Sequence, residues 1–186
     1  GKSTLGRVLA GLLEPSAGDV ELNAAPAGRR GGTALVFQDP DLSLFCDSVE
    51  EEIAFTPSLA GHDPVFTKKL TARLCGRFGL RGMEGRHPFS LSKGERQRLA
   101  VAAAIASGPS LLILDEPTKG LDMQNRERMW EALAGRGPNI ATLLITNDLD
   151  MAARCGRVVV LRKGRVAGGG TPARTIGDPE LMVRCG

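Results

Sequence analysis

The chain has 186 residues, a formal net charge of +3 and an aromatic content of 4%. This length is enough for one domain with a substantial hydrophobic core. Charges of both signs are mixed along the chain, and the few aromatic residues form no stripe with basic ones, which argues against a nucleic-acid-binding surface. The apolar runs are far shorter than the roughly 18 residues that a membrane-spanning helix needs.

The first part of the chain is predicted to contain one helix and two strands. After the opening tetrad GKST, leucine and valine residues recur at helical spacing, and this predicts a helix that ends near Glu14 and Pro15. Residues 18–23 alternate in polarity as a strand does, and residues 24–32 have the composition of a loop. The apolar residues 33–38 predict a second strand, which stops at QDPD.

The middle of the chain is predicted to be helical. Residues 47–60 indicate a helix with its N-cap at Asp47 or Ser48 and acidic residues in its first turn. The helical pattern from 63 to 109 is broken at RGMEGRHPF. We therefore expect an inserted α-helical subdomain at about residues 47–109, within a single domain of residues 1–186. Arg96 and Arg98 are expected on a solvated face of a helix in this subdomain.

The last part alternates between strands and helices. Strands are predicted at 110–117, 141–146, 158–161 and 165–170, and helices at 122–133 and 148–155. The first of these strands is continuously apolar, as expected of a strand that is buried on both faces. The alternation indicates an α/β fold with a mainly parallel central sheet.

Two short stretches carry residues suited to phosphate chemistry. GKST before a helix matches the last fixed letters of the phosphate-binding loop G-x-x-x-x-G-K-[ST], although a surface loop explains the tetrad equally well on its own. The N-terminus of the following helix offers free N–H groups and a positive dipole end to an anion. Asp115 and Glu116 end the buried strand, a position that favours a functional role over a solvated turn.

Four motifs in chain order resemble those of the nucleotide-binding subunit of ATP-binding-cassette (ABC) transporters: GKST, Gln38, the octet LSKGERQR at residues 91–98 and LLILDE at residues 111–116. The resemblance extends over nearly the whole chain, and the Leu-Ser-x-Gly core of the octet is its discriminating element. It implies a P-loop NTPase fold and an ATPase that uses ATP and Mg²⁺. It also implies that the chain begins inside the phosphate-binding loop, with the first strands of the fold missing.

The resemblance assigns a role to each motif residue. Residues expected to bind ATP are Gly1, Lys2, Ser3 and Thr4, together with Ser92, Lys93, Gly94, Glu95 and Asp122, which face the ATP of the opposite subunit. Ser3, Gln38 and Asp115 are expected at Mg²⁺. Glu116 is expected to be the general base, and Gln38 and Asn147 complete the catalytic set. Hydrolysis would require two subunits with ATP held between them.

Three positions depart from the family pattern. Lys93 stands where the family has glycine and Glu95 where it has glutamine, in a motif that acts on the partner's ATP. Asn147 stands where the family has a switch histidine, and an amide cannot carry a proton near neutral pH. We therefore expect the site that contains Lys2, Glu116 and Asn147 to bind ATP and to hydrolyse it slowly.

The stretches QDPDLSLFCDSVEEEIAF and DEPTKGLD resemble the energy-coupling-factor and cobalt-type importers. Those importers carry two cytosolic ATPases on a shared transmembrane coupling protein and take up vitamins or transition-metal ions. The resemblance implies an ATPase at the cytoplasmic face of the membrane, paired with a second ABC ATPase subunit as a homodimer, a heterodimer or a tandem fusion. Two alternatives stay open: a catalytically weak regulatory half of an asymmetric pair, and a soluble ABC protein that acts outside transport.

Overall fold

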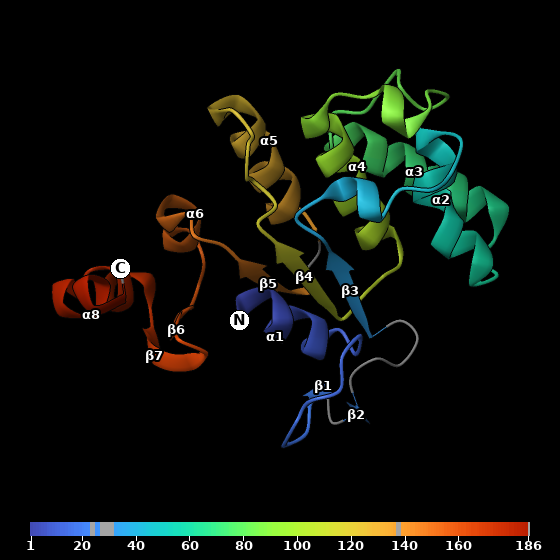
Figure 1. The fold of residues 1–186 in the computed structure, drawn as a ribbon. Helices are drawn as coiled ribbons and strands as arrows, with labels where there is room; N and C mark the ends of the chain where they lie inside the picture. Colours follow the sequence, from blue (N-terminus) through green and yellow to red (C-terminus); the bar gives the residue numbers. More distant parts are fainter. Residues whose placement is uncertain (23–24, 27–31, 137–138, 186) are drawn as a thin grey trace.

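The computed structural model describes residues 1–186 except for 23–24, 27–31, 137–138 and 186. Its centre is a three-stranded parallel sheet in the order β3 (Thr33–Val36), β4 (Leu111–Asp115) and β5 (Ala141–Ile145) (Figure 1). All three strands were predicted from the sequence. The α/β fold with a mainly parallel central sheet is confirmed.

The register of the sheet brings the ends of these strands together. Asp115, the last residue of β4, pairs with Ile145, the last residue of β5. Because the strands are parallel, the segments that leave their carboxyl ends lie along one edge of the sheet. Those segments carry Gln38, Glu116 and Asn147.

The two faces of β4 pack against different parts of the molecule. Leu112 and Leu114 point to one face and belong to the main hydrophobic core, which also contains residues of α2, α4 and α5. Ile113 points to the other face, where helix α1 (Lys2–Leu9) crosses the sheet. The side chains of β4 are buried on both sides, as the continuous apolar run predicts.

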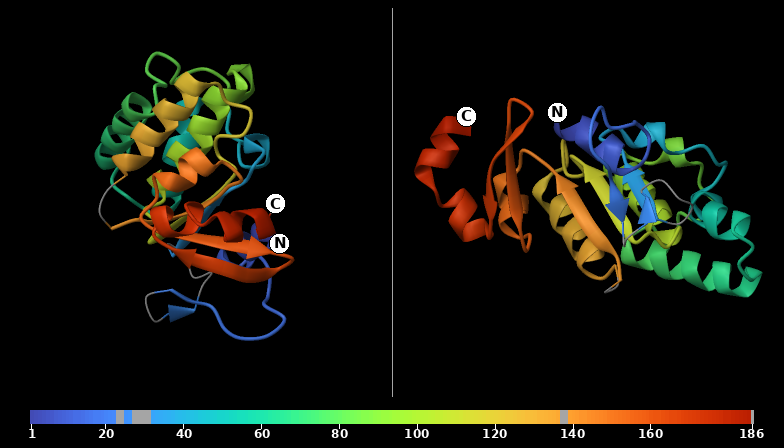
Figure 2. Two further views of the ribbon diagram at one scale, coloured as in Figure 1. Left: turned by 90° about the vertical axis from the view of Figure 1, so that its left-hand side faces the viewer. Right: turned by 90° about the horizontal axis from the view of Figure 1, so that it is seen from below.

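A group of helices stands at one end of the sheet (Figures 1 and 2). Its members are the helices α2 (Val49–Leu59), α3 (Pro64–Arg77) and α4 (Lys93–Ala106) and the short 3-10 turns η1 (Pro40–Leu42) and η2 (Pro88–Ser90). Helix α4 packs against α2 and β3, so it joins this group to the sheet. The N-cap of α2 is Ser48, whose Oγ accepts a hydrogen bond from the N–H of Glu51 at 3.2 Å.

The C-terminal elements extend from the opposite end of the sheet (Figure 2). They follow α5 and β5 in the order α6 (Leu149–Ala153), β6 (Val158–Arg162), β7 (Arg165–Gly170), α7 (Pro172–Ile176) and α8 (Pro179–Cys185), and α5 itself spans Met123–Ala134. Strands β6 and β7 form an antiparallel hairpin that is not hydrogen-bonded to the central sheet in the described part of the chain. Helices α7 and α8 pack against this hairpin.

The segment after α1 differs from the prediction. Strand β1 is only two residues long, Glu21–Leu22, and pairs antiparallel with β2, Ala25–Pro26, in a segment that was predicted to be a loop. A proline is tolerated in so short an edge strand because the strand needs few N–H donors. The rest of the predicted loop from 27 to 31 lies outside the described residues. Among those described, no helix is long and apolar enough to cross a membrane.

Candidate functional site

Helix α1 lies unusually close to the central sheet because Gly6 faces it. A Cβ at Gly6 would lie 2.8 Å from Cδ1 of Ile145, a distance that real Cβ atoms do not adopt. This close approach places Lys2 beside the carboxyl end of β5, where its Nζ donates a hydrogen bond to the carbonyl oxygen of Thr146 at 3.2 Å. The amino end of α1 therefore lies at the edge where the three strands end.

The predicted phosphate-loop residues form the N-cap and first turn of α1. Gly1 is the N-cap, without a side-chain capping bond, and the first turn contains no acidic residue. Ser3 and Thr4 are exposed. The first turn of the helix thus contributes no carboxylate of its own to compete for its N–H groups and positive dipole end, and these groups favour an anion.

Asp115 and Glu116 are neighbours in the sequence but lie in different environments. Asp115 is 8% exposed, and its Oδ1 is buried with no hydrogen-bond partner among the described residues. A buried carboxylate oxygen without a partner costs free energy, and it is a preferred ligand of Mg²⁺. No cluster of three or more His, Cys, Asp or Glu side chains occurs in the described part of the chain. The buried Asp115 carboxylate itself fits Mg²⁺, which binds proteins through one or two carboxylates and keeps several waters.

Glu116 has a strained backbone and a carboxylate surrounded by donors. Its φ is 48°, which is unusual for a residue other than glycine, and its N–H donates to the carbonyl oxygen of Ile145 at 2.8 Å. Asn147 donates to Glu116 Oε1 from its backbone N–H at 3.0 Å and from Nδ2 at 2.9 Å. The hydroxyl of Thr146 donates to Oε2 at 3.3 Å. Both carboxylate oxygens are therefore oriented by the segment after β5.

Asn147 also contacts Lys2, so it lies between a cation and a carboxylate. Its Oδ1 accepts a hydrogen bond from Lys2 Nζ, while its Nδ2 faces Glu116. These opposite partners fix the orientation of the amide, because only the carbonyl end accepts from an ammonium group. The structure thus brings three of the predicted residues, Lys2, Glu116 and Asn147, into one hydrogen-bonded cluster.

Gln38 lies near the same edge of the sheet, two residues after the end of β3, and it is exposed. The described residues offer no hydrogen bond to its side chain. The segment that follows is held from within the subunit by the buried carboxylate of Glu52, which accepts hydrogen bonds from the N–H groups of Phe45 at 2.9 Å and Cys46 at 2.8 Å. No motif pointed to this role of Glu52.

The octet at residues 91–98 begins helix α4 at some distance from this cluster. Ser92 is the N-cap and forms a capping box with Glu95, in which Ser92 N–H donates to Glu95 Oε2 at 2.7 Å. This hydrogen bond lowers the pKa of Glu95. The Nζ of Lys93 lies 4.0 Å from the position that a Cβ on Gly120 would occupy, so the first turn of α4 lies beside the loop that precedes α5.

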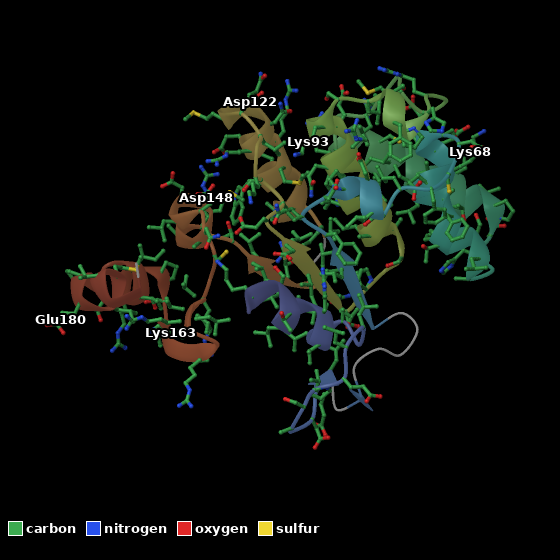
Figure 3. The ribbon with its side chains drawn as sticks, viewed as in Figure 1. Lys68, Lys93, Asp122, Asp148, Lys163 and Glu180 are labelled. Atoms are coloured by element: carbon green, nitrogen blue, oxygen red, sulfur yellow. The ribbon has the colours of Figure 1, made fainter. Side chains whose placement is uncertain are left out.

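Lys93 and Asp122 therefore lie at the same end of the molecule (Figure 3). Asp122 is the N-cap of α5, and its Oδ1 accepts a hydrogen bond from the N–H of Asn125 at 2.8 Å. No hydrogen bond among the described residues links this group to Lys2, Glu116 or Asn147. The predicted site residues of one chain thus form two separate groups.

The prediction for the arginine pair of the octet was wrong. Arg98 is only 3% exposed, and its Nε donates to the carbonyl oxygen of Phe78 at 2.8 Å. Arg96 is half-buried; it forms an ion pair with Asp41 at 2.7 Å and donates to the carbonyl oxygen of Leu91 at 2.6 Å. Both guanidinium groups join α4 to neighbouring segments instead of covering a solvated face. A buried arginine has no signal of its own in a single sequence.

Comparison with known proteins identifies the family. The profile of the ABC transporter family matches residues 1–119. The nickel import ATP-binding protein NikO of Rhodobacter capsulatus is 36% identical over 99% of this chain and 79% of its own length. The energy-coupling factor transporter ATP-binding protein EcfA1 of Latilactobacillus sakei is 35% identical over 100% of this chain and 69% of its own length.

A solved structure shows the same fold. CbiO1 of Clostridium perfringens, described as part of the ABC transporter complex CbiONQ, superposes with a TM-score of 0.84 at 30% identity. The superposition covers 99% of this chain and 78% of that one. The profile match covers more than half of the chain, and the relatives are more than 30% identical over nearly all of it. The chain belongs to the ABC transporter family, as an ATP-binding subunit with the family's ATPase activity.

Proposed function

We propose that this ATPase powers the uptake of a vitamin or a transition-metal ion, as one half of a dimer that holds ATP between its two subunits. The observation that carries the proposal is the cluster of Lys2, Glu116 and Asn147 at the amino end of α1. It combines an anion-binding helix N-terminus, a cation and an oriented carboxylate in one place. The name of NikO, a nickel import protein, supports import as the direction of transport, and the name of EcfA1 supports an energy-coupling-factor transporter.

In this proposal each residue of the cluster has a defined role. Lys2 leaves Asn147 and binds the β- and γ-phosphates, while the N–H groups of Gly1, Ser3 and Thr4 surround the phosphates at the helix end. Glu116 accepts the proton of the attacking water, and Asn147 and the segment around it orient this carboxylate.

The metal ion of the proposal is Mg²⁺. The hydroxyl of Ser3, the side-chain oxygen of Gln38 and the unpartnered Oδ1 of Asp115 would hold it together with waters. Bound there, Mg²⁺ would neutralise charge on the β- and γ-phosphate oxygens.

The second group of residues would act on the ATP of the partner subunit. Ser92, Lys93, Gly94 and Glu95 begin a helix whose N-terminus is a second anion-binding position, and Asp122 lies beside them. Because no hydrogen bond among the described residues links this group to the Lys2 cluster, we place the two groups at different ATP molecules, and a complete site would then need both subunits. Lys93 adds a positive charge at the position where phosphate would approach.

A surface formed by α2 and the segment that precedes it is suited to a transmembrane coupling protein. We define this aromatic surface by Phe45, Phe55 and Leu59, which are 64%, 42% and 77% exposed and line one groove. The two phenylalanine rings pack edge to face with centroids 4.8 Å apart. Exposed aromatic residues in a groove are typical of protein interfaces. Binding here would hold the ATPase at the cytoplasmic face of the membrane.

A second candidate function follows from Asn147. An amide orients Glu116 but cannot exchange a proton near neutral pH, and such a site is suited to bind ATP and hold the dimer closed. In that case the chain is the regulatory half of an asymmetric pair with a more regular ATPase subunit. ATP turnover distinguishes the two functions.

The test is ATP turnover and solute uptake by the full chain assembled with its membrane partner in vesicles. Glu116→Gln keeps the shape of the side chain but removes the base, and we expect it to abolish both turnover and uptake. Glu131→Gln on the exposed side of α5 is the matched control and should leave both unchanged. Turnover that survives Glu116→Gln would contradict the proposed base, and turnover without uptake would contradict the transport function.

A further inference from the structure

Asn125, which no motif marks, lies in α5 and forms hydrogen bonds with both polar atoms of its side chain, one to α4 and one to the N-cap of α5. Its Nδ2 donates to Asp122 Oδ2 at 2.9 Å, and its Oδ1 accepts from Arg98 Nη1 at 2.6 Å. Its backbone N–H donates to the other carboxylate oxygen of Asp122 at 2.8 Å. Asn125 therefore holds both oxygens of Asp122 and connects them to a residue of the octet helix.

The orientation of this amide is determined by Arg98. The guanidinium is 3% exposed, and desolvation lowers its pKa. No carboxylate lies within ion-pair distance of it among the described residues, so its hydrogen bonds go to Asn125 and to the carbonyl oxygen of Phe78. A buried cation requires acceptors, so the carbonyl end of Asn125 must face Arg98. The NH₂ end is then left to face Asp122.

The first turn of α4 also packs against side chains of the segment that leads into α5. A Cβ on Gly94 would lie 3.4 Å from Cδ2 of Leu121 and 3.6 Å from Cγ of Asn125. These are ordinary van der Waals distances, so the first turn of α4 lies against Leu121 and Asn125 without a clash. The contact with Leu121 is separate from the hydrogen bonds of Asn125, and both join the same two elements.

From these contacts we propose that Asn125 is a positioning residue that makes the start of α4 and Asp122 move as one unit. The inference rests on the proposed function, in which both groups act at the interface with the partner's ATP. When the start of α4 approaches the nucleotide of the partner, Asp122 is carried with it at a fixed distance. In this proposal Asn125 acts on the nucleotide only through Asp122 and Arg98, the two residues that it binds.

The test separates the two ends of the amide. Asn125→Asp keeps an acceptor for Arg98 but has no donor for Asp122 and places a second carboxylate beside it. Asn125→Ala removes both contacts and leaves Arg98 without one of its acceptors, which lowers thermal stability. Gln124→Ala is the matched control, because Gln124 lies in the same turn, is exposed and has no side-chain hydrogen bond among the described residues.

We would measure kcat and KM for ATP and thermal unfolding of the full chain in its assembled complex. We expect Asn125→Asp to lower kcat about tenfold, the effect of losing one oriented hydrogen bond at the closed interface, with KM for ATP and the unfolding temperature little changed. Gln124→Ala should match the unchanged protein. A kcat of Asn125→Asp within twofold of the unchanged protein would overturn the proposal, as would a loss confined to unfolding temperature.

Glu116→Gln, measured in parallel, separates this inference from the proposed function. If Glu116→Gln abolishes turnover and Asn125→Asp has no effect, only the role of Asn125 is wrong. If turnover survives Glu116→Gln, the assignment of Glu116 as the general base in the proposed function is wrong, whatever the Asn125 variants do.

Discussion

Asn147 donates two hydrogen bonds to a single oxygen of Glu116, at 3.0 Å from its backbone N–H and at 2.9 Å from Nδ2. The other end of the same amide accepts from Lys2. An uncharged side chain that neither gains nor loses a proton near neutral pH thus lies between the cation and the carboxylate of the cluster. The position is suited to orienting Glu116 and unsuited to proton exchange.

Asn147→His should therefore accelerate ATP hydrolysis. An imidazole at this position adds a group that carries a proton, and we expect turnover to rise on the order of tenfold. The size of this increase in turnover should change with pH around 6.5, the usual pKa of histidine, because the new side chain gains or loses its proton there. The measurement is steady-state turnover between about pH 5.5 and 8.5. Asn139→His, an exposed position outside the cluster, is the control, and equal turnover in both variants would contradict the prediction.

Thr146 is a further residue whose replacement should affect the chemical step. Its hydroxyl donates to Glu116 Oε2 at 3.3 Å and accepts from the N–H of Asp148 at 2.9 Å. Thr146→Val removes both contacts with little change in volume, and we expect kcat to fall about threefold to tenfold with KM for ATP preserved. Thr146→Ser retains the hydroxyl and should retain most of the activity. A serine variant as slow as the valine variant would show that packing, not the hydroxyl, matters here.

Gly6 should be sensitive to the smallest possible enlargement. A Cβ at this position would lie 2.8 Å from Ile145 Cδ1, so Gly6→Ala forces α1 or the end of the Ile145 side chain to move. Overpacking costs about 1 to 3 kcal/mol and the higher helix propensity of alanine offsets about 1 kcal/mol, so we expect a net loss of up to about 2 kcal/mol in the free energy of unfolding. Ile145→Val removes the atom in conflict. The double variant should therefore be more stable than the sum of the two single losses predicts. Denaturant unfolding of the four proteins measures this, and simple additivity would contradict the contact.

Titration of Glu95 should make the free energy of unfolding depend on pH. The N–H of Ser92 lowers its pKa in the folded protein below the usual 4.5, so protonation opposes folding. The sign follows from linkage: this stabilisation is present above the unfolded value and is lost as the pH falls through the folded value. Glu95→Gln cannot titrate, so the stability difference between it and the unchanged protein should shrink as the pH falls from about 6 to 3. A constant difference over this range would refute the capping-box contribution.

The architecture could be predicted because it depends on local patterns. The continuous apolar run of β4 predicts a strand buried on both faces, and Ser48 is one of two N-caps expected for α2. The group of Lys2, Glu116 and Asn147 was expected because each residue follows a recognisable motif. Parallel strands bring such residues to one edge of the sheet, and the structure places these three in contact.

Other parts depend on contacts between distant segments, which a single sequence does not reveal. Arg98 looks like a surface arginine, and its burial depends on Phe78 and Asn125, 20 and 27 residues away. The hairpin of β1 and β2 involves only two residue pairs, too few to give a periodic pattern. Helices α7 and α8 are short and were not predicted, because their apolar residues pack on the β6–β7 hairpin and show no sustained period.

The buried carboxylate of Glu52 has a consequence for association. It binds the backbone N–H groups of Phe45 and Cys46 within the isolated subunit, so the start of the aromatic surface already has its conformation. Fixing the backbone of a flexible residue costs about 1 to 2 kcal/mol in conformational entropy. The subunit loses this conformational entropy when it folds, so binding a partner does not require the same loss again. A protein that covers Phe45 and Phe55 therefore meets a preorganised surface, and more of the apolar contact counts toward affinity.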